Sequence, residues 1–187
     1  RYGLPNRYLL FVGTIERRKN LARLLAAFEP ISSEGLSDGL VIVGRRGWLY
    51  GDFFARLEQS PVKHAVLFPG YVADEDLPAI YAGAQALVFP SLCEGFGLPV
   101  LEAMACGTPV VSSNASSIPE AGGEAALYFD PTDTAEIVST TRRLLREADL
   151  QDSLRARGLA QAARFSWGLA ASATEAVYDA ALRGGVG

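Results

Sequence analysis

The chain has 187 residues, 49% of them hydrophobic and 20% charged, with a net charge of −4. These values predict one globular domain, residues 1–187, with a sizeable core. The acidic balance argues against nucleic-acid binding, because the longest basic run is Arg17–Lys19. The chain lacks both a membrane-spanning apolar run and a signal-peptide pattern, and its two cysteines do not indicate a disulfide framework. We therefore expect a cytoplasmic location.

Six short apolar runs alternate with helical patterns along the chain. The runs predicted as strands are 8–12, 40–43, 65–68, 86–89, 109–111 and 125–129. The segments predicted as helices are 21–28 with Asn20 as N-cap, 75–82 with Asp74 as N-cap, 98–105, 134–146, 150–164 and 167–182. This alternation predicts an α/β fold with a doubly wound, Rossmann-like parallel sheet. Such sheets bind ligands at the carboxyl ends of their strands.

A turn with several cations, Gly13-Thr14-Ile15-Glu16-Arg17-Arg18-Lys19-Asn20, follows the first strand. Gly13 permits a sharp turn and a close approach of a ligand to the backbone. Arg18 and Lys19 place two positive charges near the next helix start, where a diphosphate would gain contacts from both. The alternative is a solvated basic turn without a ligand, and the pattern does not decide whether Arg17 has a role.

The loops after the second and third strands carry weaker signals. In Gly44-Arg45-Arg46-Gly47-Trp48-Leu49, packing of Trp48 against a helix is favoured over a role of Arg45 at a diphosphate. Tyr71 and Val72 follow the third strand. His64 stands at the start of that strand, away from its carboxyl end, so a structural or surface role is favoured over catalysis.

The segment Glu94-Gly95-Phe96-Gly97-Leu98-Pro99-Val100-Leu101-Glu102 joins the fourth strand to a helix and is the most informative in the chain. A helix start offers unpaired N–H groups and partial positive charge, which suit phosphate. Gly95 and Gly97 let a ligand approach the main chain, and Pro99 fits the first helical turn. Carboxylates on either side would repel phosphate but accept hydroxyl groups. The pattern therefore outlines a nucleotide sugar; the alternative is an ordinary strand–helix unit with both glutamates solvated.

Glu-Gly-Phe-Gly-Leu-Pro, followed by Glu-Ala-Met-Ala-Cys-Gly-Thr-Pro-Val-Val, resembles the carboxylate-pair motif of the retaining GT-B glycosyltransferases of family four. The resemblance implies the C-terminal, donor-binding lobe of the GT-B fold. It implies that Glu94 contacts the donor sugar and that Glu102 binds the ribose hydroxyls. The backbone amides of Phe96, Gly97 and Leu98 would lie near the sugar and the diphosphate.

The resemblance extends to other loops. In the family, a Gly-Arg pair and a later lysine grip the diphosphate; Lys19 matches the lysine, but Thr14 replaces the arginine. Gly-Thr-x-Glu-x-Arg-Lys-Asn resembles a mannosyltransferase-like subgroup, which makes Arg18 the candidate for the missing charge. The backbone at Val72 is expected to contact the nucleobase. Ser91 is expected at the floor of the base or ribose pocket, unless it is only a turn residue.

Residues 112–120 resemble the family's loop after the fifth strand, and their serines and asparagine are expected to satisfy the loop backbone. For Cys93 and Cys106 a role as small buried apolar side chains is favoured, with Cys93 lining the site as the alternative. With one histidine and two cysteines, the sequence shows no cluster with metal-ligand spacing, so we expect no metal and no cofactor.

The implied reaction retains the anomeric configuration, with the acceptor attacking on the face that the nucleotide leaves. Charge on the leaving group would be met by Lys19, Arg18 and the helix amides. The candidate catalytic residues are therefore Lys19, Arg18 and Glu94, with Glu94 placed at the sugar. The donor-binding candidates are Gly13, Thr14, Val72, Ser91, Phe96, Gly97, Leu98 and Glu102.

The resemblance thus implies the donor half of a hexosyltransferase, inactive as an isolated lobe. Its donor would be a GDP-sugar such as GDP-mannose, or a UDP-sugar such as UDP-glucose. We expect 1–7 to be a linker from an N-terminal acceptor lobe and 184–187 to be a frayed tail; a peripheral membrane contact through that lobe is left open. The alternatives are a non-catalytic nucleotide-sugar-binding module paired with a separate chain, or an epimerase or phosphorylase lobe.

Overall fold

The computed structural model of the chain describes residues 1–45, 47 and 51–184, apart from the side chain of Asp52. Within these residues, six parallel strands form one sheet in the order β3-β2-β1-β4-β5-β6. The strands are β1 Tyr8–Val12, β2 Gly39–Val43, β3 Val66–Leu67, β4 Ala86–Phe89, β5 Val110–Ser113 and β6 Ala126–Phe129. The order reverses between the central neighbours β1 and β4, so the prediction of a doubly wound parallel sheet is confirmed.

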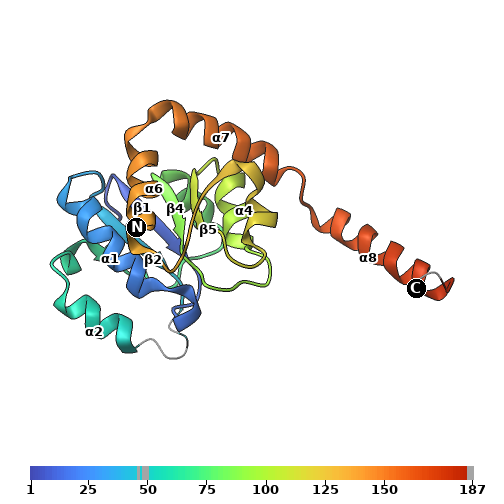
Figure 1. Cartoon of the computed structure of the whole chain (residues 1–187), viewed down its shortest axis with the longest axis horizontal. Coiled ribbons are helices and arrows are strands. Elements are labelled where there is room, and N and C mark those ends of the chain that lie inside the picture. The colour runs from blue at the N-terminus through green and yellow to red at the C-terminus, as the bar shows by residue number, and fades with distance from the viewer. Residues whose placement is uncertain (46, 48–50, 185–187) are drawn as a thin grey trace.

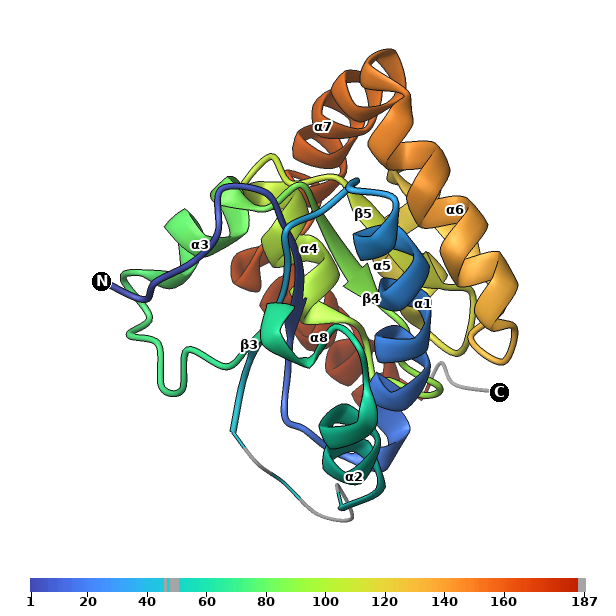
Figure 2. The same cartoon turned by 90° about the vertical axis from the view of Figure 1, so that its left-hand side faces the viewer.

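Helices cover both faces of this sheet (Figure 2). The α-helices are α1 Leu21–Ser33, α2 Gly51–Gln59, α3 Leu77–Gly83, α4 Leu98–Ala105, α5 Ile118–Gly122, α6 Thr134–Arg146, α7 Ala148–Ala162 and α8 Trp167–Leu182; the 3-10 turns are η1 Arg17–Lys19, η2 Lys63–Ala65 and η3 Gly123–Ala125. On one face α1 packs against α2 and α6, and on the other α4 packs against α3, α5 and α7. Because both faces are covered, β2, β4 and β5 are buried along their whole length.

The last helix, α8, projects from the body of the molecule (Figure 1). None of its residues is buried, and Trp167 at its start is 81% exposed. Searching the described residues for a helix long and apolar enough to cross a membrane finds none.

One helix start lies away from its predicted position. Asp74 was expected to cap a helix beginning at Glu75, but α3 begins at Leu77 and Asp76 is its N-cap residue, so that prediction is wrong. A turn closed by the Asp76 N–H and the Ala73 carbonyl oxygen occupies the intervening residues. The Asp76 carboxylate does not cap the helix, because it accepts hydrogen bonds from Tyr2 and Arg1 instead.

Asn20 is the N-cap residue of α1 as predicted, but its side chain does not cap the helix. Its backbone is left-handed, with φ of 59°, and its side-chain nitrogen donates to the carbonyl oxygens of Pro90 and Pro131 at 3.1 and 2.7 Å. Pro90 follows β4 and Pro131 follows β6. Asn20 therefore ties the start of α1 to two other strand ends, where ligands of such sheets bind.

The backbones that leave β1 and β2 lie in direct contact at the same edge of the sheet. A side chain at Gly44 would place its Cβ 2.0 Å from the carbonyl oxygen of Gly13, and Gly44 has φ of +152°. Only glycine fits both the space and this backbone conformation.

This contact can be tested with Gly44→Ala. We expect the free energy of unfolding to fall by roughly 2–4 kcal/mol, since overpacking and a positive φ each cost about 1–2 kcal/mol or more. The control is Gly35→Ala, where φ is +67° but nothing lies within 4 Å of the new Cβ. It should cost only about 1–2 kcal/mol. Equal losses in urea denaturation would contradict the close approach of the two loops.

Candidate functional site

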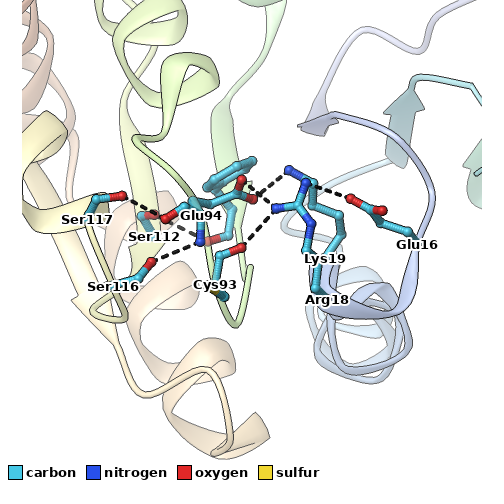
Figure 3. Close-up of polar contacts among 9 residues, drawn as sticks. Glu16, Arg18, Lys19, Cys93, Glu94, Ser112, Ser116 and Ser117 are labelled. Carbon is cyan, nitrogen blue, oxygen red and sulfur yellow. Dashed lines mark hydrogen bonds and ion pairs between the residues drawn. The ribbon is translucent and has the colours of Figure 1, made fainter.

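Loops that follow β1 and β4 meet at the carboxyl edge of the sheet around the Glu94 carboxylate (Figure 3). The Lys19 ammonium lies 2.5 Å from one carboxylate oxygen, and an Arg18 nitrogen lies 2.8 Å from the other. The three residues predicted to be catalytic are therefore in mutual contact. They meet because β1 and β4 are neighbours in the sheet although about 75 residues separate them in the chain.

Lys19 is a buried cation. Its side chain is only 7% exposed, and its ammonium lies 5.3 Å from the centre of the Phe89 ring. A Cβ on Gly13 would lie 3.6 Å from the same ammonium, an ordinary contact distance, so the turn after β1 lies directly beside the lysine. A desolvated ammonium requires a partner, and Glu94 supplies the negative charge.

Arg18 lies on the solvent side of the cluster and bridges two carboxylates. One of its terminal nitrogens donates to Glu94 and, at 2.9 Å, to the Cys93 carbonyl oxygen, while the other lies 2.7 Å from a Glu16 oxygen. Glu16 was not among the predicted site residues. Its position in the Gly-Thr-x-Glu-x-Arg-Lys-Asn pattern, two residues before Arg18, is the signal that could have identified it.

The loop after β5 contacts the backbone of Glu94. The Glu94 N–H donates to the Ser116 hydroxyl at 2.9 Å, and the Ser117 hydroxyl donates to the Glu94 carbonyl oxygen at 2.9 Å (Figure 3). These serines were expected only to satisfy their own loop. No local pattern in the sequence indicates this contact, because it depends on how two loops meet in space.

The environment of Glu94 favours its ionised form. Burial alone would raise the pKa of its carboxyl group, but hydrogen bonds from Lys19 and Arg18, together with the nearby Ser91 hydroxyl, outweigh burial, so the pKa lies below its ordinary value. The Ser91 side chain is fully buried, and its hydroxyl makes no hydrogen bond of normal geometry to the described residues. It lies near enough to the carboxylate to contribute to this lowering of the pKa.

The start of α4 leaves several backbone donors without partners. Gly97 is the N-cap residue, with φ of 105°, and Pro99 lies in the first turn as predicted. Within the described part of the chain, no acceptor is found for the backbone N–H groups of Phe96, Gly97 and Leu98. Such donors, together with the helix dipole, make an anion site.

Two side chains at this helix start face different surroundings. The ring of Phe96 packs edge-on against Phe165, in the segment between α7 and α8, with ring centres 5.8 Å apart. Leu98 is 46% exposed. If these residues take part in donor binding, their backbone amides are the groups available for it.

Glu102 lies on the same helix but outside the ion-pair cluster. Its carboxylate is exposed and accepts a hydrogen bond of 2.7 Å from the hydroxyl of Tyr81 on α3. Burial and the nearby negative charge of Glu102 raise the pKa of Tyr81, so this hydroxyl stays a donor. Glu94 and Glu102 therefore have separate partners among the described residues, and the start of α4 lies between them.

The remaining predicted residues lie apart from the ion-pair cluster. Thr14 is exposed beside Gly47, Val72 is buried in the loop after β3, and His64 is exposed at the amino end of β3, in keeping with a surface role. The packing predicted for Trp48 lies outside the described residues.

The prediction that Cys93 is a buried side chain is wrong. Its side chain is exposed rather than buried, in the loop that precedes Glu94. Cys106 is partly buried. A search of the described residues for groups of three or more His, Cys, Asp or Glu side chains that could hold a metal ion finds none.

Comparisons with known proteins place this geometry in context. A model of the family described as Glycosyl transferases group 1 matches residues 6–147. The chain is 44% identical over 161 residues to the O-antigen chain mannosyltransferase B of Escherichia coli, covering 86% of this chain and 42% of that protein.

Solved structures share the fold. Sucrose-phosphate synthase from Thermosynechococcus elongatus superposes with a TM-score of 0.81 at 28% identity, over 97% of this chain and 47% of that one. The C-terminal domain of the glycosyl transferase group 1 family protein LpcC from Francisella tularensis superposes with a TM-score of 0.74 at 25% identity, over 86% and 87% of the two chains. The chain thus spans less than half the length of the E. coli and T. elongatus proteins.

The buried ion pair predicts a pH-dependent loss of stability in Glu94→Gln. At neutral pH we expect unfolding free energy to fall by roughly 3 kcal/mol, since the variant leaves the buried Lys19 without a countercharge. Glu94 has a lowered pKa, so its contribution is complete above its ordinary pKa of 4.5 and is lost as pH falls through the folded value. The difference between wild type and variant should therefore shrink below about pH 4.5.

Urea denaturation at a series of pH values measures this difference. The control is Glu147→Gln, which removes an exposed partner of Arg143 and should change stability by less than about 1 kcal/mol at every pH. A wild-type advantage over Glu94→Gln that does not depend on pH would contradict the assigned ion pair.

Proposed function

Since the chain belongs to the group 1 glycosyl transferases and has the fold of a GT-B C-terminal domain, we propose that it binds a nucleotide-diphosphate sugar as the donor half of a hexosyltransferase. The observation that carries the proposal is the position of Glu94. Its carboxylate is paired with Lys19 and Arg18 beside the unpartnered amides at the start of α4. This arrangement joins cations, backbone donors and a hydroxyl acceptor in one place.

The diphosphate is assigned to the helix start and to Lys19. An ammonium has three N–H donors, and Glu94 uses one of those on Lys19, so others are available to phosphate oxygens. Glu16, Arg18, Lys19 and Glu94 together carry no formal net charge. A diphosphate therefore meets donors without strong repulsion from the carboxylates.

The sugar and the ribose are assigned to opposite sides of the diphosphate. Glu94 accepts hydroxyl groups of the sugar, and Glu102 accepts those of the ribose. Tyr81 donates to one oxygen of Glu102, which leaves the other oxygen for a ribose hydroxyl. The backbone at Gly13, Thr14 and Val72 completes the donor pocket, with the base beside Val72 and Ser91 beneath the base or ribose.

In the transfer, the acceptor hydroxyl oxygen bonds to the anomeric carbon while the bond from that carbon to the diphosphate oxygen breaks, and the hydroxyl proton passes to the departing diphosphate. Negative charge grows on the departing diphosphate, where Lys19, Arg18 and the α4 amides would meet it without reorganisation. Retention of configuration and independence from metals and cofactors belong to this proposal. The proposal also includes a cytoplasmic location, a linker at 1–7 and an acceptor lobe. Without that lobe the chain would be inactive.

Mannose is the preferred sugar, because the E. coli relative is named as a mannosyltransferase. GDP-mannose is therefore the first donor to test and UDP-glucose the second. The compared proteins carry transferase or synthase names, which does not favour the epimerase or phosphorylase alternatives.

Titration calorimetry with GDP and UDP tests the diphosphate assignment. Lys19→Ala should weaken binding of the preferred nucleotide by about 1.5–3 kcal/mol, the value of a charge-assisted hydrogen bond. The control is Lys63→Ala, because Lys63 pairs with Glu58 at the amino end of β3 and should not affect affinity. Absence of wild-type binding to both nucleotides at millimolar concentration would overturn the proposal.

The ribose assignment has its own test. Glu102→Ala should lower affinity for a nucleoside diphosphate with intact ribose hydroxyls by about 1–3 kcal/mol, since a charged acceptor is lost. For the 2′,3′-dideoxy analogue the loss should be much smaller. Equal losses for the two ligands, measured by the same titration, would assign Glu102 to another role.

A further inference from the structure

We propose that Ser116 and Ser117 are positioning residues that hold the peptide of Glu94 so that its carboxylate stays directed at the donor sugar. This inference rests on the proposed function, because it requires the sugar-binding role of Glu94. It concerns the loop between β5 and α5, to which the proposed function gives no part.

Both peptide groups next to Glu94 are held by other loops (Figure 3). The Ser116 hydroxyl accepts from the Glu94 N–H, and the Ser117 hydroxyl donates to the Glu94 carbonyl oxygen, each at 2.9 Å. Arg18 donates to the Cys93 carbonyl oxygen, also at 2.9 Å. The backbone on either side of Glu94 is therefore fixed from outside its own loop.

Each serine departs from the conformation or hydrogen bonding that is usual for its position. Ser116 has φ of +52°, a backbone region that residues other than Gly, Asn and Asp rarely adopt. Ser117 is the N-cap residue of α5, a position where serine usually accepts from the helix backbone, yet its side chain makes no such bond. The hydrogen bonds to Glu94 account for both departures.

The chain around Glu94 needs this support. Gly95 follows immediately, and nothing lies within 4 Å of the place where its Cβ would be. Glycine has the largest backbone freedom of any residue, so Glu94 is not fixed by its own segment. The same freedom would let the carboxylate move away from the sugar.

The serine contacts differ from the ion pairs in how a donor affects them. A bound diphosphate would share Lys19 and Arg18 with Glu94 and so weaken their attraction for its carboxylate, because it is an anion at the same cations. It does not compete for the hydrogen bonds between Ser116, Ser117 and the Glu94 backbone. These neutral bonds therefore keep Glu94 in place when the cations turn to the donor.

The test compares affinities of the chain for a nucleoside diphosphate and its nucleotide sugar, by calorimetry with GDP and GDP-mannose or with UDP and UDP-glucose. Wild type should bind the nucleotide sugar of one pair more tightly. Ser116→Gly and Ser117→Ala should reduce this preference about five- to tenfold, roughly the effect of one lost hydrogen bond. Affinity for the diphosphate alone should change by less than about twofold, since its own contacts remain.

Three controls separate positioning from general stability. Ser116→Gly relieves the unfavourable φ, which offsets the lost hydrogen bond, so its melting temperature should stay close to that of wild type even as the sugar preference falls. Ser117→Thr keeps the hydroxyl and should keep the preference. Asn114→Ala changes an exposed side chain of the same loop and should alter neither quantity.

The Glu94→Gln background decides whether the serines act through Glu94. There, Ser117→Ala should cause no further loss of sugar preference. An unchanged preference in Ser116→Gly and Ser117→Ala, or an equal further loss in the Glu94→Gln background, would overturn the inference while leaving the proposed function intact. If wild type binds each nucleoside diphosphate as tightly as its nucleotide sugar, the sugar-binding role of Glu94 is contradicted. This inference would then be overturned with it. Wild type that binds none of these ligands refutes the proposed function itself.

Discussion

A lysine ammonium buried at the meeting of two strand ends is the constraint on which the site depends. Such a charge is tolerated only beside an anion, and Glu94 is the carboxylate within reach of Lys19. The two residues follow β1 and β4, which are adjacent because the strand order reverses between them. The ion pair at the site thus depends on the topology of the sheet, because it forms between loops that follow two neighbouring strands.

The elements around this pair all connect separate strand ends. Asn20 links the start of α1 to the segments after β4 and β6, and Gly13 lies in contact with Gly44 after β2. The contacts that hold the donor edge together are therefore made by residues far apart in the sequence. Such contacts tie a site whose residues lie in loops to the sheet beneath it.

Much of the fold could be predicted from the sequence, because strands covered on both faces appear as continuous apolar runs such as 86–89. The position of Lys19 and Glu94 after strand ends was predictable, since glycines and charges mark these ends in the sequence. What could not be predicted depends on contacts between distant loops. The Asp76 carboxylate binds Tyr2 and Arg1 instead of capping α3, and Ser116 reaches Glu94 across the site. Local capping rules do not contain such competing partners.

The exposure of Cys93 has a practical consequence. Its thiol is open to solvent one residue before Glu94, whereas Cys106 is partly shielded and burial, then the charge of Glu102, raises the pKa of its thiol. A maleimide dye should therefore couple selectively to Cys93 in the unmodified chain. Its emission would report directly on movements of the Glu94 loop, with no engineered cysteine required.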